Sequence, residues 1–104
     1  MSDLEVTTED LASTVVFHVA GTVDGNTALV LQEPLLRAAE GTKGAVHIDL
    51  AKVPFMSSAG LRVLLLAAKA LNKRSERLRL INVPPHIYNV LNIAGFTSFI
   101  DVKS

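Results

Sequence analysis

The sequence predicts an α/β domain with a sheet that is at least partly parallel. From Ala45 onward, segments with strand periodicity alternate with segments of helical periodicity, which is the pattern of βαβ units joined by right-handed crossovers. Strand-like segments before Ala45 would extend the same sheet. A chain of 104 residues fits one domain that folds without metals or disulfides, so we expect a single domain over residues 1–104.

Composition favours a protein partner. Ten Lys and Arg residues balance ten Asp and Glu residues, which argues against nucleic acid or an anionic membrane as the main partner. The chain has no cysteine, as suits a reducing cytosol. Its N-terminus does not resemble a signal peptide, and the longest apolar run, Val63 to Ala68, is far shorter than the roughly 20 residues of a membrane span. We expect a cytoplasmic protein without direct membrane insertion.

Two strands are predicted in the N-terminal part. Leu4 to Thr8 has the composition of a short edge strand, and Glu9-Asp10 suggests a turn after it. Thr14 to Ala20 is rich in β-branched residues, and Gly21 then ends the segment.

A polar loop and a helix follow. Asp24-Gly25 suits a turn, and Asn26 or Thr27 can cap the next helix, which we expect from Thr27 to Ala39. Pro34 lacks a backbone donor and clashes with the carbonyl four residues earlier, so it predicts a kink or a break. The apolar positions that recur at helical spacing are Val30, Leu31, Leu35, Ala38 and Ala39.

The strongest strand signal and the longest helix signal lie in the middle of the chain. Ala45 to Leu50 alternates, with Val46, Ile48 and Leu50 on one face. The helix predicted from about Ser58 to Arg74 is apolar nearly all round, so it should be largely buried against a sheet.

The last part predicts two strands and a short helix. Leu78 to Val83 is a strand that Pro84-Pro85 cannot continue. Pro85 to Ala94 is a helix, with Gly95 past its end, and a final strand is expected around Phe99 to Asp101.

Two serines at the predicted strand-to-helix turn, Ser57 and Ser58, have two interpretations. One serine can cap the helix, a contribution of about 1 kcal/mol. Alternatively, a serine is phosphorylated: the helix N-terminus tolerates the charge, whereas a bound partner would have to desolvate it. Asp24 likewise is either a turn former or a binding residue.

The sequence gives little support for catalysis, metals or cofactors. His18, His47 and His86 lack the spacing of metal ligands. A triad of Ser58, His47 and Asp49 can be imagined, but Ser58 is not in a G-x-S-x-G elbow. No phosphate-binding glycine loop is present. We therefore predict no catalytic residues, no metal site and no cofactor.

The stretch Phe55–Leu65, preceded by Ile48-Asp49-Leu50, resembles the STAS domain family, and within it the bacterial anti-sigma factor antagonists. Gly21-Thr22-Val23-Asp24 is similar to the family pattern G-x-[LIV]-D after the first long strand. Asn82-Val83 and Ala94-Gly95-Phe96 resemble its closing elements. The resemblance thus extends across nearly the whole chain.

The resemblance implies a mixed β-sheet of four to five strands with helices packed mainly on one side. It also implies partner switching: the unphosphorylated antagonist binds a serine-kinase anti-sigma factor, phosphorylation releases it, and a PP2C-type phosphatase resets it. The chain would be the substrate and not the enzyme, and we expect a monomer or weak dimer. The alternative is an unphosphorylated STAS subunit of a lipid-transport or stressosome-like complex, in which Ser58 is only a cap.

By position, the resemblance assigns phosphorylation to Ser58. The family often has Asp-Ser-Ser-Gly where this chain has Ser57-Ser58-Ala59-Gly60, so Ser57 replaces the usual acid and is the alternative acceptor. Asp24 matches a loop aspartate that contacts partners. The implied partner-binding residues are Asp24, Ser57, Ser58, Gly60, Leu61 and Arg62.

Overall fold

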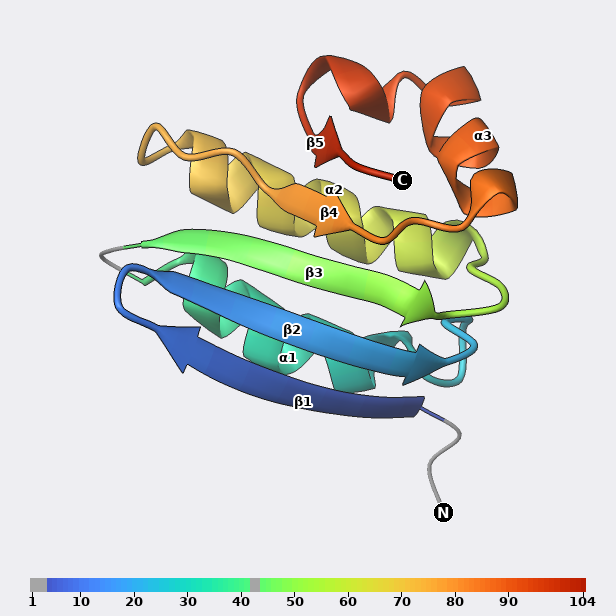
Figure 1. Ribbon diagram of the computed structural model, residues 1–104, viewed down its shortest axis with the longest axis horizontal. Coiled ribbons are helices and arrows are strands. Elements are labelled where there is room, and N and C mark those ends of the chain that lie inside the picture. The colour runs from blue at the N-terminus through green and yellow to red at the C-terminus, as the bar shows by residue number, and fades with distance from the viewer. Residues whose placement is uncertain (1–3, 42–43) are drawn as a thin grey trace.

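The computed structural model describes residues 4–41 and 44–104, so the N-terminal residues that were compared with a signal peptide lie partly outside the described part. Within these described residues, five strands and three α-helices follow one another (Figure 1). Their order is β1 (Leu4–Leu11), β2 (Thr14–Gly21), α1 (Ala28–Ala39), β3 (Ala45–Lys52), α2 (Ser58–Asn72), β4 (Arg79–Ile81), α3 (Pro85–Ile93), the 3₁₀ helix η1 (Phe96–Ser98) and β5 (Asp101–Val102).

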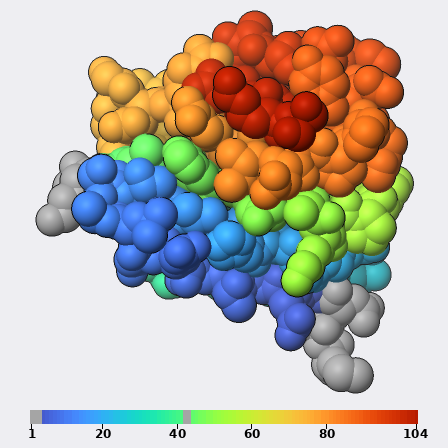
Figure 2. Space-filling model, viewed as in Figure 1, coloured from blue at the N-terminus to red at the C-terminus, as the bar shows by residue number. Residues whose placement is uncertain are grey.

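The strands form one mixed sheet. They lie side by side in chain order; β1 is antiparallel to β2, and the other neighbours are parallel. Helices α1 and α2 both lie behind the sheet in Figure 1. Figure 2, drawn from the same side, shows β1 to β3 at the surface with no helix over them. The predicted fold class, a mixed sheet with helices mainly on one side, is confirmed.

The core lies between the sheet and the two long helices. The predicted inward face of β3, Val46, Ile48 and Leu50, is completely buried, and Phe17 of β2 lies beside it in the sheet register. Helix α2 contributes Leu64 and other apolar residues to the same cluster. Each such side chain contributes roughly 1.5–3 kcal/mol when it is fully buried, so the core holds the ends of β2, β3 and α2 in fixed positions.

The predicted turn at Glu9-Asp10 is wrong. Strand β1 continues to Leu11, with Glu9 opposite Val16 and Leu11 opposite Thr14, and the hairpin turns at Ala12-Ser13 instead. The carboxylate of Glu9 pairs with His18 across the strands. Local composition suggested a turn, but this contact between strands favours the extended conformation.

Helix α1 runs through Pro34 without a break, so of the predicted kink or break, the break is wrong. Leu31, Leu35 and Ala39 are fully buried on one face of the helix, and this packing outweighs the missing hydrogen bond. Val30, one of the apolar residues at helical spacing, is 41% exposed and lies outside this buried face.

Helix α2 ends at Asn72, two residues before the predicted end. Arg74 lies in the following turn, where its guanidinium donates hydrogen bonds to the carbonyl oxygens of Ala39 (3.0 Å), Gly44 (2.9 Å) and Ala38 (3.3 Å). Arg74 thereby adds side-chain hydrogen bonds at the C-terminus of α1, where the last carbonyls lack the usual donors of a continuing helix. The carbonyl of Ala38 also accepts from the N–H of Gly41 (3.2 Å).

The last two strands are shorter than predicted. Strand β4 covers only Arg79–Ile81, because Asn82 adopts a φ of 54° and leaves the extended conformation. The expected strand around Phe99 is wrong for Phe99 itself, whose N–H bonds the carbonyl of Phe96 in the η1 turn (3.1 Å). Pairing with β4 begins at Asp101. No helix among the described residues has the length and apolar character to cross a membrane.

Candidate functional site

The predicted site lies where β2 and β3 end. Val23 and Met56 form an isolated parallel bridge: the N–H of Val23 donates to the carbonyl of Phe55 (3.0 Å), and the N–H of Ser57 donates to the carbonyl of Val23 (2.8 Å). Asp24 directly follows Val23, so these bonds place Asp24 and the two serines at one end of the sheet. The structure thus brings together residues that are more than 30 positions apart in the chain.

The two serines have different environments. Ser57 is half-buried and is the N-cap of α2; its Oγ accepts a hydrogen bond from the N–H of Ala59 (3.2 Å). Ser58 is the first residue of the helix and is exposed, and its hydroxyl makes no hydrogen bond with any described residue. The hypothesis that Ser58 is only a cap is therefore wrong, because Ser57 has that role.

Asp24 organises the loop before α1. Its carbonyl accepts hydrogen bonds from the N–H groups of Thr27 (3.2 Å) and Ala28 (2.8 Å), and its Oδ1 accepts from the N–H of Asn26 (2.9 Å). The turn-forming interpretation is confirmed. The second carboxylate oxygen makes no hydrogen bond with the described residues, so the half-buried side chain keeps an acceptor for another molecule.

Thr27 is the N-cap residue of α1, one of the two residues predicted for that position, but it does not cap in the expected way. Its side chain makes no capping hydrogen bond. Instead, the Thr27 hydroxyl accepts from the N–H of Asp24 (3.0 Å) and donates to the carbonyl of Thr22 (2.8 Å). Because this hydroxyl bonds the backbone on either side of Val23, at Thr22 and Asp24, it fixes the segment that carries Asp24.

Gly60 lies beneath the predicted surface and not on it. The residue is buried, and a Cβ added there would lie 2.5 Å from Cγ of Met56 and 2.9 Å from Cγ1 of Val23. Glycine is thus required for α2 to approach the bridge between the two loops. Leu61 is half-buried and Arg62 is exposed, so of the three residues Arg62 is the most accessible.

Sequence reasoning missed two exposed apolar residues at this end of the molecule. Phe55, in the loop before Ser58, is 53% exposed, and Leu29, in the first turn of α1, is 65% exposed. Periodicity indicates which helix face is apolar, but it does not reveal that an apolar residue stays uncovered. Solvent-exposed apolar groups around an accessible polar residue are typical of protein interaction sites.

The imagined triad is not assembled. Ser58 bonds neither His47 nor Asp49, and both of those residues face the open side of the sheet, opposite the buried Val46, Ile48 and Leu50. Burial, and to a lesser extent the charge of Arg79, lower the pKa of His47. Within residues 4–41 and 44–104, no three His, Cys, Asp or Glu side chains are grouped to hold a metal ion.

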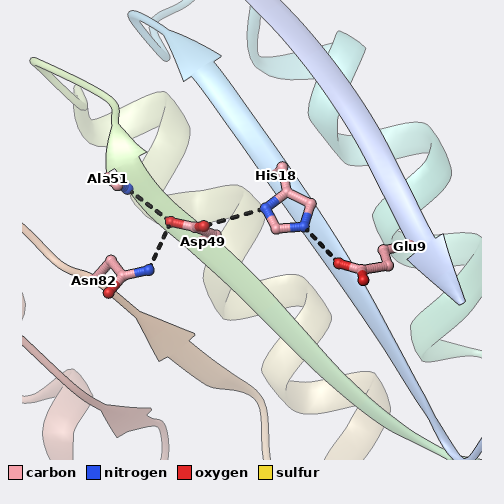
Figure 3. A network of polar contacts seen from close by, with 5 residues as sticks. All are labelled: Glu9, His18, Asp49, Ala51 and Asn82. Atoms are coloured by element: carbon pink, nitrogen blue, oxygen red, sulfur yellow. Dashed lines mark hydrogen bonds and ion pairs between the residues drawn. The ribbon is translucent and has the colours of Figure 1, made fainter. Parts of the chain in front are cut away.

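Asp49 belongs instead to a network on the open face of the sheet (Figure 3). His18 lies between two carboxylates: its Nδ1 is 3.1 Å from Oδ2 of Asp49, and its Nε2 is 3.0 Å from Oε1 of Glu9. Oδ1 of Asp49 accepts hydrogen bonds from the N–H of Ala51 (3.0 Å) and the amide of Asn82 (3.2 Å). The network links β1, β2 and β3 to the residue that follows β4.

Hydrogen bonding shifts two pKa values in this network. Hydrogen bonds with Glu9, and then with Asp49, raise the pKa of His18. Burial alone would raise the pKa of Asp49, but the bonds from Ala51, Asn82 and His18 outweigh burial and lower it. Only a protonated imidazole can donate from both ring nitrogens, so the geometry corresponds to a positively charged His18 between two carboxylates.

The mixed sheet, together with the turn that carries Ser57 and Ser58 at the start of a buried helix, is characteristic of one class of small α/β domain. The model of the STAS domain family matches residues 4–104, and the chain belongs to the STAS domain family.

Within that family the chain is similar to anti-sigma factor antagonists. It is 33% identical over 88 residues to the anti-sigma-B factor antagonist of Listeria monocytogenes, with 83% of this chain and 75% of the relative covered.

Solved structures share the fold. An anti-sigma factor antagonist from Mycobacterium paratuberculosis has a TM-score of 0.85 at 23% identity, with 96% of this chain and 85% of that chain covered. The antagonist SpoIIAA in its unphosphorylated form has a TM-score of 0.80 at 20% identity, covering 96% and 89%. The phosphorylated form of SpoIIAA, a Bacillus cell fate determinant, has a TM-score of 0.76 at 20% identity, covering 96% and 92%.

Proposed function

We propose that this chain is an anti-sigma factor antagonist that works by partner switching. Unphosphorylated, it binds a serine-kinase anti-sigma factor; phosphorylated on Ser58, it is released. The observation that carries the proposal is the exposed Ser58 hydroxyl, free of hydrogen bonds to the described residues, at the start of α2. The chain is a binding module and a substrate of other enzymes, and it performs no catalysis itself.

The relatives support this function. A protein of similar sequence is named an anti-sigma-B factor antagonist, and SpoIIAA, which has the same fold, exists in unphosphorylated and phosphorylated forms. We infer a cytoplasmic single domain over residues 1–104, a monomer or weak dimer, whose partners are proteins and not nucleic acid.

The modification requires no chemistry from this chain beyond its hydroxyl. The kinase transfers the γ-phosphoryl group of ATP to Oγ of Ser58: the new O–P bond forms as the bond to ADP breaks, and the hydroxyl proton passes to a base of the kinase. A PP2C-type phosphatase reverses the switch by hydrolysis, which regenerates the hydroxyl and releases phosphate. Ser57 is less suited as an acceptor, because its Oγ is engaged by the N–H of Ala59.

The surroundings of Ser58 explain why phosphorylation would release the partner. Exposed Phe55 and Leu29 supply apolar area, and Asp24 and Arg62 supply charges for a complementary protein surface. A phosphate adds nearly two negative charges. Those charges would have to be desolvated against a surface shaped for a neutral serine, and each 1.4 kcal/mol of penalty weakens binding about tenfold.

Phosphorylation by the cognate kinase tests the acceptor. With ATP present, we expect one phosphate per chain, located on Ser58 by mass spectrometry of the intact protein and its peptides. Ser58→Ala should abolish the modification, and Ser57→Ala, the matched control, should leave it in place. Stoichiometric phosphate on Ser58→Ala would contradict the assignment. Partner binding with no modification of the native chain would instead favour the unphosphorylated STAS subunit.

A charge substitution tests the switch. Ser58→Asp places a negative charge at the first position of α2, which the helix dipole tolerates, so the fold should persist. Affinity for the anti-sigma factor, measured by calorimetry, should fall at least tenfold, whereas Ser58→Asn, which is polar but uncharged, should lose less. Equal affinities for the Asp and Asn variants would count against a charge-based switch.

A further inference from the structure

Arg62 is an exposed cation without a partner among the described residues. It makes no hydrogen bond and no ion pair with any residue in 4–41 or 44–104. Helix α2 itself offers no acidic partner, because its sequence, SAGLRVLLLAAKALN, contains Arg62 and Lys69 but no Asp or Glu. The guanidinium of Arg62 is therefore available to bind a negatively charged group that is introduced nearby.

Arg62 lies one helical turn after Ser58, on the same side of α2. Residues four apart on a helix have Cβ atoms about 5–6 Å apart. Cα–Cβ bonds tilt toward the helix N-terminus, so the long side chain of Arg62 covers the turn that precedes it, which is the turn of Ser58. An anion four residues before a cation is also the more favourable order for such a pair.

We propose that Arg62 binds the phosphate on Ser58 within the same chain. This inference rests on the proposed function, since it takes Ser58 as the phosphorylated residue. The planar guanidinium can donate two parallel hydrogen bonds to phosphate oxygens, a geometry that a lysine cannot match. Ser57 does not compete, because its Oγ caps the helix by accepting from Ala59.

Because Arg62 pairs with the phosphate, phosphorylation changes the surface around Ser58 in two ways. The phosphate adds negative charge at residue 58, and it also withdraws the guanidinium of Arg62 from the surface offered to a partner. An anti-sigma factor that contacts Arg62 in the unphosphorylated state would therefore lose that contact at the same time. Arg62 is a positioning residue for the phosphate and has no role in the transfer itself.

The phosphate's own titration tests this pairing. Phosphoserine inserted at position 58 during translation requires no kinase, and its second pKa, ordinarily about 6, is read from the phosphorus NMR shift at low salt. A nearby cation favours the doubly charged phosphate and lowers this pKa. We therefore expect Arg62→Gln to raise the pKa by about 0.3 or more.

Lys69→Gln is the matched control, because it removes an equal charge from the same helix further from Ser58. A rise in Arg62→Gln that exceeds the rise in Lys69→Gln by about 0.3 or more supports the pair, and a smaller difference overturns it. Arg62→Lys should keep at least half of the effect; its complete loss would point to a structural change and overturn the pair. The proposed function would survive that outcome, since it is decided separately by kinase labelling and partner binding.

Discussion

Ser57 and Ser58 are adjacent and chemically identical, and the start of α2 gives them different roles. The helix begins at Ser58, so the preceding hydroxyl accepts the hydrogen bond from Ala59 while the hydroxyl of Ser58 stays free of the described residues. The family often has an acid at the position of Ser57. Serine and aspartate are both good N-caps, so the replacement keeps the helix start while it removes a negative charge beside the proposed acceptor, Ser58.

The cap assignment predicts unequal effects on stability. Ser57→Ala should lower the free energy of unfolding by about 1 kcal/mol, which corresponds to a melting temperature lower by roughly 4–8 °C for a domain of this size. Ser57→Asp should stay within about 0.5 kcal/mol of the native chain, because it also caps. Urea denaturation measures both.

Ser58→Ala is the control for this prediction, because its hydroxyl bonds no described residue. It should change stability by less than about 0.5 kcal/mol. Equal losses for Ser57→Ala and Ser58→Ala would show that the helix does not begin where we place it.

At the scale of elements, the site depends on how closely α2 approaches the two loops. Gly60 permits that approach, since a methyl group would meet Met56 and Val23 at 2.5 and 2.9 Å. Both neighbours are themselves buried, so neither can move without disturbing the core.

Gly60→Ala should therefore destabilise the protein by about 1–3 kcal/mol through overpacking. It should also weaken binding of the anti-sigma factor, because α2 and Ser58 would shift away from Asp24. Thermal unfolding and calorimetry measure the two effects. Gly25→Ala is the matched control: nothing lies within 4 Å of the added Cβ, and its stability should stay within about 0.5 kcal/mol. A fully stable Gly60→Ala would contradict the close packing.

The strands and helices were largely predictable from local patterns, whereas their ends were not. Alternation identified the buried face of β3, because burial on one side of a strand leaves a period of two. By contrast, Glu9 continues β1 because it meets His18, and Asn82 ends β4 with a positive φ. Such contacts and backbone conformations join or end elements in ways that local composition does not encode.

The site was predictable in part. The resemblance to the STAS family identified Asp24 and the turn with Ser57 and Ser58 as candidate site residues. The structure places them at one end of the sheet. The exposure of Phe55 and the burial of Gly60 depend on how distant segments pack, so spacing along the chain could not indicate them.

At the scale of the whole molecule, the His18 network ties three strands together and makes their association depend on pH. The pKa of His18 is raised in the folded protein. Its stabilising contribution is therefore fully present below about pH 6.5, the unfolded value, and is lost as pH rises through the folded pKa. The pKa of His47 is lowered, so His47 acts in the opposite direction and destabilises the fold as pH falls below about 6.5.

Histidine titration by NMR checks this pair of predictions. The ring C–H signal of His18 should titrate above about pH 6.5 and that of His47 below it. In His18→Gln, the loss of stability relative to the native chain should shrink between about pH 6 and pH 9. Coincident titration of His18 and His47 would contradict the network drawn in Figure 3.

The bridge between Val23 and Met56 affects how the binding surface of such a protein can change during evolution. The loops of the site are joined by main-chain hydrogen bonds, and these do not depend on which side chains the loops carry. Phe55 and Arg62, whose side chains make no hydrogen bond or ion pair with the described residues, can thus be exchanged by mutation while Ser58 keeps its place. After gene duplication, a few substitutions at such positions could change which partner one copy binds. The same scaffold can then serve several signalling pathways in one cell without cross-reaction between them.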